Sequence, residues 1–304
     1  MPHIMIVGSI NMDLVVRVAH LPQSGETILG RDHQAIPGGK GANQAVAAAR
    51  LGAKVTMIGR VGQDAFGDLL LENLHREGID VRAIQFDSQA SSGIAMITLD
   101  EQGRNTIVVA PGANMTMTLG EVTAALDAIP LVDVLVLQLE SPVECVLHAA
   151  RLGHARKAKV ILNPAPARAL PDEIYQYIDV LVPNESETSL LSGLPVDTFE
   201  KAETAARNLL ATGARSIVLT LGERGALVID GSHPAVHIRA HAVQVVDTTA
   251  AGDAFVAGLA VGLAEGYDLV EAARLGNAAG AIAVTRLGAQ PAMPRRTEVE
   301  RFLR

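Results

Sequence analysis

Two carboxylates, Asp247 and Asp253, stand six residues apart in a segment of small residues that precedes the apolar run 256–264. Small residues at the start of a helix let a ligand approach the backbone, and the free N–H groups and helix dipole there form an anion site. Asp253 would then take a proton from a hydroxyl that attacks a bound phosphate, unless it only caps the helix. Asp247 favours the first interpretation, because a second carboxylate at this spacing suits a loop around an ion. The anion donors would be the N–H groups of Ala250, Ala251 and Gly252.

A glycine-rich segment at 37–45, Pro-Gly-Gly-Lys-Gly-Ala-Asn-Gln-Ala, also precedes a helical pattern. It is not a P-loop, because Gly41 rather than Ser or Thr follows Lys40 and position 34 is not glycine. It is not the dinucleotide-binding fingerprint either, because Gln44 stands where the third glycine belongs. With Lys40 and Asn43 in the turn, the segment suits a hydroxyl-rich ligand or a phosphate; the alternative is a solvated helix start.

Polar side chains also follow several predicted strands. Asn11 and Asp13 come after the first strand, where amide and carboxylate groups could hold sugar hydroxyls. Other strands end at Glu140, at the pair Asn184 and Glu187, and at the glycine-bearing turn 219–226, which suits a flat base or a ribose edge. Each signal alone is typical of ordinary turns. Because several strand ends carry such groups, we predict that they form one site.

These residues need a framework of alternating strands and helices. Apolar runs rich in β-branched residues predict strands at 3–7, 55–58, 132–137, 160–162, 180–182 and 217–221. Helical spacing of apolar residues predicts helices at 41–51, 64–76, 143–154, 185–191, 198–211, 251–264 and 269–284. This alternation indicates an α/β fold with mostly parallel strands covered by helices on both faces. We expect one domain over residues 1–304.

Two stretches, 14–37 and 92–110, break the alternation, because neither contains a helix that could connect parallel strands. The second reads as a hairpin, with strands near 94–99 and 106–109 around the turn 100–103. We expect a small antiparallel sheet outside the main sheet. Because ligands of open α/β sheets bind beyond the carboxyl ends of the strands, this sheet could serve as a lid.

The composition excludes several classes of protein. The chain has 304 residues, of which 49% are hydrophobic and 19% charged, so it can bury a core and is not disordered. A net charge of −8 argues against nucleic-acid and membrane-surface partners. We find no apolar run of the roughly 20 residues that span a bilayer and no basic leader, so we expect a soluble cytoplasmic protein.

The single cysteine could indicate redox chemistry and three regularly spaced histidines a metal site, but we favour neither interpretation. Cys145 lies in a predicted helix and reads as a small core residue. His233, His237 and His241 recur every four residues, which on a helix would give a metal-binding face. Pro234 and the alternating apolar residues instead predict a strand with solvated histidines.

Taken in order, these motifs resemble the ribokinase-like, PfkB family of carbohydrate kinases over essentially the whole chain. Residues 38–43 resemble the family's N-terminal signature, residues 247–253 its C-terminal signature, and Asn184 with Glu187 its Asn-x-x-Glu element. The resemblance implies a three-layer α/β/α fold with a mostly parallel central sheet and a small β-sheet lid. Within the family, the chain is most similar to members that transfer the γ-phosphoryl group of ATP to D-ribose, giving D-ribose 5-phosphate.

The resemblance also implies roles for individual residues. Asp253 would be the catalytic base, and Ala250, Ala251 and Gly252 the anion hole. The sugar contacts would be Asn11, Asp13, Gly39, Lys40, Asn43, Glu140 and Asp253. The ATP contacts would be Asn184, Thr220, Gly222, Gly225, Gly252 and Asn277. Glu187 would act on Mg²⁺ through water.

Members similar to this chain bind an activating K⁺ ion. The corresponding oxygens here would come from the carboxylate of Asp247 and the backbone carbonyls of Thr249, Ala283, Arg286 and Gly288. The chain departs from the pattern at Ala292, where serine is common, so one side-chain ligand would be missing.

Several alternatives stay open. The acceptor could be 2-deoxyribose, fructose or a nucleoside, although 3% aromatic residues and no tryptophan leave little stacking surface for a purine. The protein could also be a non-catalytic sugar-binding protein that kept the fold. The family implies a homodimer formed through the lid sheets, with a small sugar as the substrate.

Overall fold

A nine-stranded sheet forms the centre of the computed structural model, which describes residues 1–129 and 131–304. Its strand order is β13-β12-β11-β10-β9-β8-β1-β4-β5, parallel from β5 to β11 and antiparallel at β12 and β13. The prediction of a mostly parallel sheet is therefore confirmed. The strand bounds are β1 His3–Val7, β4 Lys54–Gly62, β5 Asp80–Asp87, β8 Val134–Leu137, β9 Lys159–Leu162, β10 Val180–Leu181, β11 Ser216–Thr220, β12 Ala226–Asp230 and β13 Val236–Ile238.

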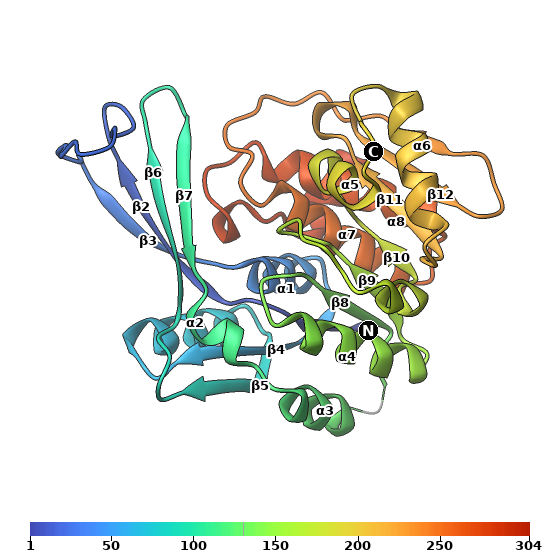
Figure 1. Ribbon diagram of the computed structural model, residues 1–304, viewed down its shortest axis with the longest axis horizontal. Coiled ribbons are helices and arrows are strands. Elements are labelled where there is room, and N and C mark those ends of the chain that lie inside the picture. Colours follow the sequence, from blue (N-terminus) through green and yellow to red (C-terminus); the bar gives the residue numbers. More distant parts are fainter. Residues whose placement is uncertain (130) are drawn as a thin grey trace.

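Helices cover both faces of this sheet, giving the three layers expected (Figure 1). Alternate residues of β1 point to opposite faces, so Ile4 and Ile6 belong to one buried cluster and Met5 and Val7 to the other. The first cluster packs under α1 Lys40–Arg50, α2 Ala65–Arg76, α7 Ala251–Ala264, α8 Leu269–Ala283 and α9 Arg296–Phe302. The second packs under α3 Leu119–Ala128, α4 Val143–Ala155, α5 Glu185–Ser192 and α6 Phe199–Leu210.

A second sheet of four strands, which we call the lid sheet, rises from one side of the main sheet (Figure 1). Its order is β3-β2-β6-β7, with bounds β2 Asn11–Arg17, β3 His33–Gly38, β6 Gly93–Leu99 and β7 Asn105–Ala110. The predicted hairpin is confirmed as β6 and β7. The expected antiparallel pairing is confirmed for β2 with β3 and for β6 with β7, but β2 and β6 pair in parallel. Both strands follow parallel strands of the main sheet, β1 and β5, and so enter the lid sheet in the same direction.

Short 3₁₀ helices connect several of these elements. They are η1 Gly112–Thr116, η2 Asp172–Tyr177, η3 Gly222–Arg224 and η4 Gln290–Ala292. Cys145 lies in α4 and is buried, as expected for a core residue. The predicted histidine-bearing strand is β13, where His237 is exposed; His233 and His241 lie outside it. Among the described residues, no helix is long and apolar enough to cross a membrane.

Candidate active site

The predicted base and several predicted nucleotide contacts line one cavity of about 200 Å³. The strands β9, β10 and β11 end beside it, and the first turns of α1, α5 and α7 point into it. The cavity therefore lies at the carboxyl edge of the sheet, where α/β proteins bind ligands. Its lining residues are Lys40, Asn163, Ala165, Val182, Asn184, Glu187, Thr220, Ala250, Gly252, Asp253 and Val256.

Asp253 is buried in the first turn of α7 and is held by two amides of α1. Asn43 Nδ2 donates to Asp253 Oδ2 at 2.9 Å, and Gln44 Nε2 donates to Asp253 Oδ1 at 2.9 Å. Burial raises the pKa of Asp253, while Lys40 and the two amide donors act in the opposite direction. Asp253 does not cap α7, because the N-cap position is Ala250 and no side chain accepts a hydrogen bond there. The helix-cap interpretation of Asp253 is therefore wrong.

The N-terminus of α7 leaves its first turn available to a ligand. Ala250 adopts a left-handed conformation with φ 58°, and the Ala251 N–H makes only a 3.3 Å hydrogen bond to the Thr248 carbonyl. A side chain at Gly252 would meet no atom within 4 Å, so this glycine faces open space. Free N–H groups and the helix dipole make such a turn suitable for an anionic ligand.

Lys40 begins α1 among four acidic groups. Burial opposes the charge of Lys40, but the carboxylates of Asp253, Glu140, Glu187 and Asp13 outweigh it and raise the pKa of the lysine. Glu140 also accepts a hydrogen bond from the Ser9 hydroxyl and one of 3.3 Å from the Lys40 N–H. The structure therefore brings the predicted sugar contacts of α1 and of the β8 strand end together.

Asn11 and Asp13 begin β2, the strand that leaves the main sheet for the lid sheet. Burial raises the pKa of Asp13 to about 7, with further contributions from Glu140 and Asp253 and an opposing one from Lys40. Gly39 has φ +89°, and a Cβ there would lie 2.7 Å from Asn11 N. Only glycine lets α1 start this close to β2.

The predicted nucleotide contacts divide into two groups. Asn184 caps α5, and both carboxylate oxygens of Glu187 accept hydrogen bonds from it, at 2.8 Å from Asn184 N and 3.0 Å from Asn184 Nδ2. Burial raises the pKa of Glu187. Thr220 pairs with Asn184 and lines the same cavity. Three predicted contacts lie outside its lining: Gly222 and Gly225 of the turn after β11, and Asn277, whose amide donates to the Arg239 carbonyl at 2.9 Å.

Asp247 joins the two segments of the predicted cation loop. Its Oδ1 accepts from the Thr249 N–H at 2.9 Å and from the Thr249 hydroxyl at 2.6 Å, and its Oδ2 accepts from the Gly288 N–H at 2.8 Å. Burial would raise the pKa of Asp247, but these hydrogen bonds outweigh it and lower the pKa. The Ala283 carbonyl accepts from the Arg286 N–H at 3.2 Å. Ala292 is buried in η4 and has no side-chain oxygen.

Gln44 and Gln138 belong to the site but were not among the predicted contacts, and neither were four residues of the cavity lining, Asn163, Ala165, Val182 and Val256. Gln44 is fully buried, and its Nε2 donates both to Asp253 and, at 3.2 Å, to Asn163 Oδ1. Gln138 Nε2 in turn donates to Gln44 Oε1 at 2.6 Å. The usable signal in the sequence was an adjacent Asn-Gln pair in a helix otherwise rich in alanine, because two amides there need buried partners.

Comparisons with known proteins agree with this geometry. A family model described as pfkB family carbohydrate kinase matches residues 1–296. The chain belongs to this family of carbohydrate kinases. It is therefore a phosphotransferase that acts on a sugar alcohol group, and the resemblance seen in the sequence is confirmed.

Individual relatives match over nearly their full length. A ribokinase from Bacillus subtilis is 43% identical over 303 residues, covering 100% of both chains. A deoxyribokinase from Salmonella typhi is 37% identical over 300 residues, covering 98% of this chain and 97% of the relative. The solved structure of Arabidopsis thaliana ribokinase complexed with ribose and ATP is 33% identical with a TM-score of 0.93, covering 100% of this chain and 99% of that chain.

Proposed function

We propose that this carbohydrate kinase is a ribokinase, which transfers the γ-phosphoryl group of ATP to the hydroxymethyl oxygen of D-ribose. The products are D-ribose 5-phosphate and ADP. The observation that carries the proposal is the buried carboxylate of Asp253, which two amides hold beside an open helix N-terminus. The relatives named above support ribose as the acceptor and ATP as the donor.

In this proposal Asp253 is the general base. It takes the proton of the hydroxymethyl group as that oxygen bonds to the γ-phosphorus, while the bond from the γ-phosphorus to the bridging oxygen of ADP breaks. The N–H groups of Ala250, Ala251 and Gly252 stabilise the charge that develops on the phosphoryl oxygens. Lys40, already surrounded by carboxylates, adds a fixed positive charge.

We assign the sugar to the side of the site that faces the lid sheet. Asn11, Asp13, Asn43 and Glu140 supply amide and carboxylate groups, which suit a small polyhydroxylated ligand. The nucleotide would lie on the opposite side, with its contacts at Asn184, Thr220, Gly222, Gly225 and Asn277.

Glu187 suits an indirect contact with Mg²⁺. Each of its oxygens accepts one hydrogen bond from Asn184 and keeps a further lone pair. A water bound to the ion could donate to these remaining lone pairs. When bound to ATP, Mg²⁺ neutralises charge on the phosphates. The residue that holds this water would be Glu187.

The loop closed by Asp247 suits K⁺. Hydrogen bonds from Thr249 and Gly288 lower the pKa of Asp247 and so favour an ionised carboxylate. Oxygen donors of this kind bind hard cations, and the carbonyls of Thr249, Ala283, Arg286 and Gly288 would complete the set. A bound cation would supply positive charge beside the anion site.

The lid sheet is our proposed dimer interface. Consecutive residues of β7 are exposed although they are large and apolar, and Met96 of β6 is exposed as well. Surfaces of this kind mark protein interfaces. The residues of β7 concerned are Ile107, Val108 and Val109.

We also place the protein in the cytoplasm, where the ATP it consumes is made available.

The test is ADP release with Mg-ATP and each of D-ribose, 2-deoxy-D-ribose, D-fructose and adenosine, in K⁺ or Na⁺ buffer. We expect turnover to be fastest with ribose and to rise when K⁺ replaces Na⁺. Fastest turnover with 2-deoxy-D-ribose would instead favour a deoxyribokinase, a second candidate that the match to the Salmonella typhi deoxyribokinase supports. Absence of turnover with every sugar, together with measurable sugar binding, would contradict catalysis.

A further inference from the structure

We infer that Asn114 is a positioning residue for the sugar substrate, because its amide fixes which end of the Asn11 side chain faces the site. The inference rests on the proposed function in one respect, namely that Asn11 contacts the sugar. Asn114 lies in η1, directly after the lid strand β7, and only 1% of it is exposed.

The Asn114 side chain links two chain segments at the base of the lid sheet. Its Oδ1 accepts from the Ile10 N–H at 2.9 Å. Its Nδ2 donates to Asn11 Oδ1 at 2.7 Å, to the Pro111 carbonyl at 3.0 Å and to the Ile10 carbonyl at 3.2 Å. One buried amide therefore joins the connection from β1 to β2 with the segment that follows β7.

The orientation of both amides follows from the backbone groups. A backbone N–H can only donate, so the Asn114 atom that faces Ile10 N must be oxygen, and its NH₂ group must face Asn11. The Asn11 atom that receives this donor must then also be oxygen. Among the described residues, Asn11 Nδ2 has no hydrogen-bond partner, so Asn11 offers the site a donor.

Asn11 and Asp13 therefore present complementary groups. They are two residues apart in β2 and so lie on the same face of the strand. Asn11 would donate to a sugar oxygen, whereas an ionised Asp13 would accept from a hydroxyl group. A ligand that satisfies both needs hydroxyl groups that donate and accept, which matches a sugar.

The space around the two amides leaves no room for a side chain. Gly93 of β6 pairs with Asn11, and a Cβ at position 93 would collide with Asn11 Oδ1 and Asn114 Nδ2. This glycine has no positive φ, so the close approach of the amides is what requires it. The contact between Asn114 and Asn11 thus fills the space beside Gly93.

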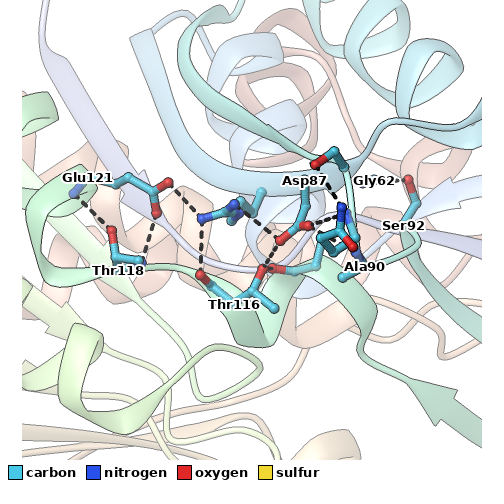
Figure 2. Close-up of polar contacts among 11 residues, drawn as sticks. Gly62, Asp87, Ala90, Ser92, Thr116, Thr118 and Glu121 are labelled. Atoms are coloured by element: carbon cyan, nitrogen blue, oxygen red, sulfur yellow. Dashed lines mark hydrogen bonds and ion pairs between the residues drawn. The ribbon is translucent and has the colours of Figure 1, made fainter.

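The η1 segment is itself anchored to the main sheet (Figure 2). Thr116 Oγ1 donates to Asp87 Oδ2 at 2.6 Å, and Arg60 Nη1 donates to the Thr116 carbonyl at 3.1 Å. Arg60 also forms ion pairs with Asp87 at 3.1 Å and with Glu121 at 2.8 Å. Because these contacts fix Thr116, two residues along the chain, they hold Asn114 at the base of the lid sheet.

The test compares Asn114→Ala, Asn11→Ala and the double variant with the wild type. We expect Asn114→Ala to raise the KM for ribose roughly tenfold, because Asn11 loses the hydrogen bond that orients it toward the sugar. The KM for ATP and kcat should stay within about threefold of the wild-type values. In the Asn11→Ala background the same substitution should change the KM for ribose less than about threefold, because Asn114 acts through Asn11. Gly93→Ala should give the same pattern as Asn114→Ala.

The control is Ser216→Ala, at the far end of β11. It removes a partly buried hydrogen bond to the Asp179 carbonyl and should lower the unfolding temperature without changing the KM for ribose. An equal rise in KM for ribose in both backgrounds, or an equal rise in KM for ATP, would overturn the inference in favour of a merely structural role. If the wild type prefers another sugar, ribose fails as the proposed acceptor, and the same four enzymes measured with that sugar still decide the role of Asn114.

Discussion

At the scale of residues, amide groups set the positions of the carboxylates in the site. Asn43 and Gln44 hold Asp253, and Asn184 holds both oxygens of Glu187. Amides remain neutral at every pH, so they orient a carboxylate without adding charge. This leaves Lys40 and the N-terminus of α7 as the groups that favour negative charge in the cavity.

The raised pKa of Asp13 predicts a pH-dependent effect on stability. Its folded-state pKa of about 7 exceeds the ordinary value of 3.8, so the folded protein binds this proton more tightly than the unfolded chain. The free energy of unfolding that Asp13 contributes must therefore fall as pH rises from about 4 to 7. We expect the free energy of unfolding of Asp13→Asn, relative to that of the wild type, to rise between pH 5 and 8 by on the order of 2 kcal/mol. Urea unfolding without ligands measures this difference.

The exposed Asp32→Asn, measured over the same range, is the matched control for the removal of a carboxylate. A constant or shrinking difference for Asp13→Asn would show that Asp13 ionises as easily in the folded protein as in the unfolded chain.

Sequence patterns predicted the residues of the two signatures but not their partners. Lys40, Asn43 and Asp253 stand in recognisable local motifs, and the cavity brings Lys40 and Asp253 together. Gln44 and Asn114 act through residues 209 and 103 positions away in the chain, respectively. A contact between distant segments leaves no local pattern in the sequence, so only the three-dimensional structure reveals it.

At the scale of elements, the close packing of α7 on α8 positions the helix that carries Asp253. The two helices meet at glycines, since a Cβ at Gly258 would lie 2.8 Å from Gly276 Cα, and one at Gly276 would lie 2.6 Å from the Phe255 carbonyl. Sequence patterns predicted both helices. They did not predict the parallel pairing of β2 with β6, because strand direction depends on how distant strands leave the main sheet.

This helix contact predicts a stability difference between two glycine substitutions. Gly276→Ala should lower the free energy of unfolding by about 1–3 kcal/mol, because the added methyl group meets backbone atoms that cannot move aside. Gly120→Ala, in an open turn of α3, should instead raise it by roughly 0.5–1 kcal/mol. Urea unfolding of both variants measures the difference; equal effects would show that α7 and α8 can separate at little cost.

At the scale of the whole molecule, the lid sheet connects the proposed sugar side of the site to an exposed apolar surface. Asn11 and Asp13 begin β2, and two strands further along the same sheet Val108 of β7 is 62% exposed. A second copy of the chain that covers this surface would also stabilise the strand that carries the proposed sugar contacts.

We predict that Val108→Asp converts the proposed dimer into a monomer, because it places a charge in the centre of an apolar interface. Light scattering after size-exclusion chromatography at micromolar concentration measures the mass. Leu190→Asp, an equally drastic change at a residue 53% exposed on α5, should leave the dimer intact. A monomeric wild type, or a Val108→Asp variant that stays dimeric, would contradict the proposed interface.

The most direct test of the central claim is the turnover of Asp253→Asn with ribose and Mg-ATP, measured beside ribose binding by calorimetry. The substitution keeps the shape of the side chain and removes its ability to accept the hydroxyl proton. We predict that kcat falls at least ~10²-fold while ribose still binds. Near-normal turnover would contradict the assignment of Asp253 as the base.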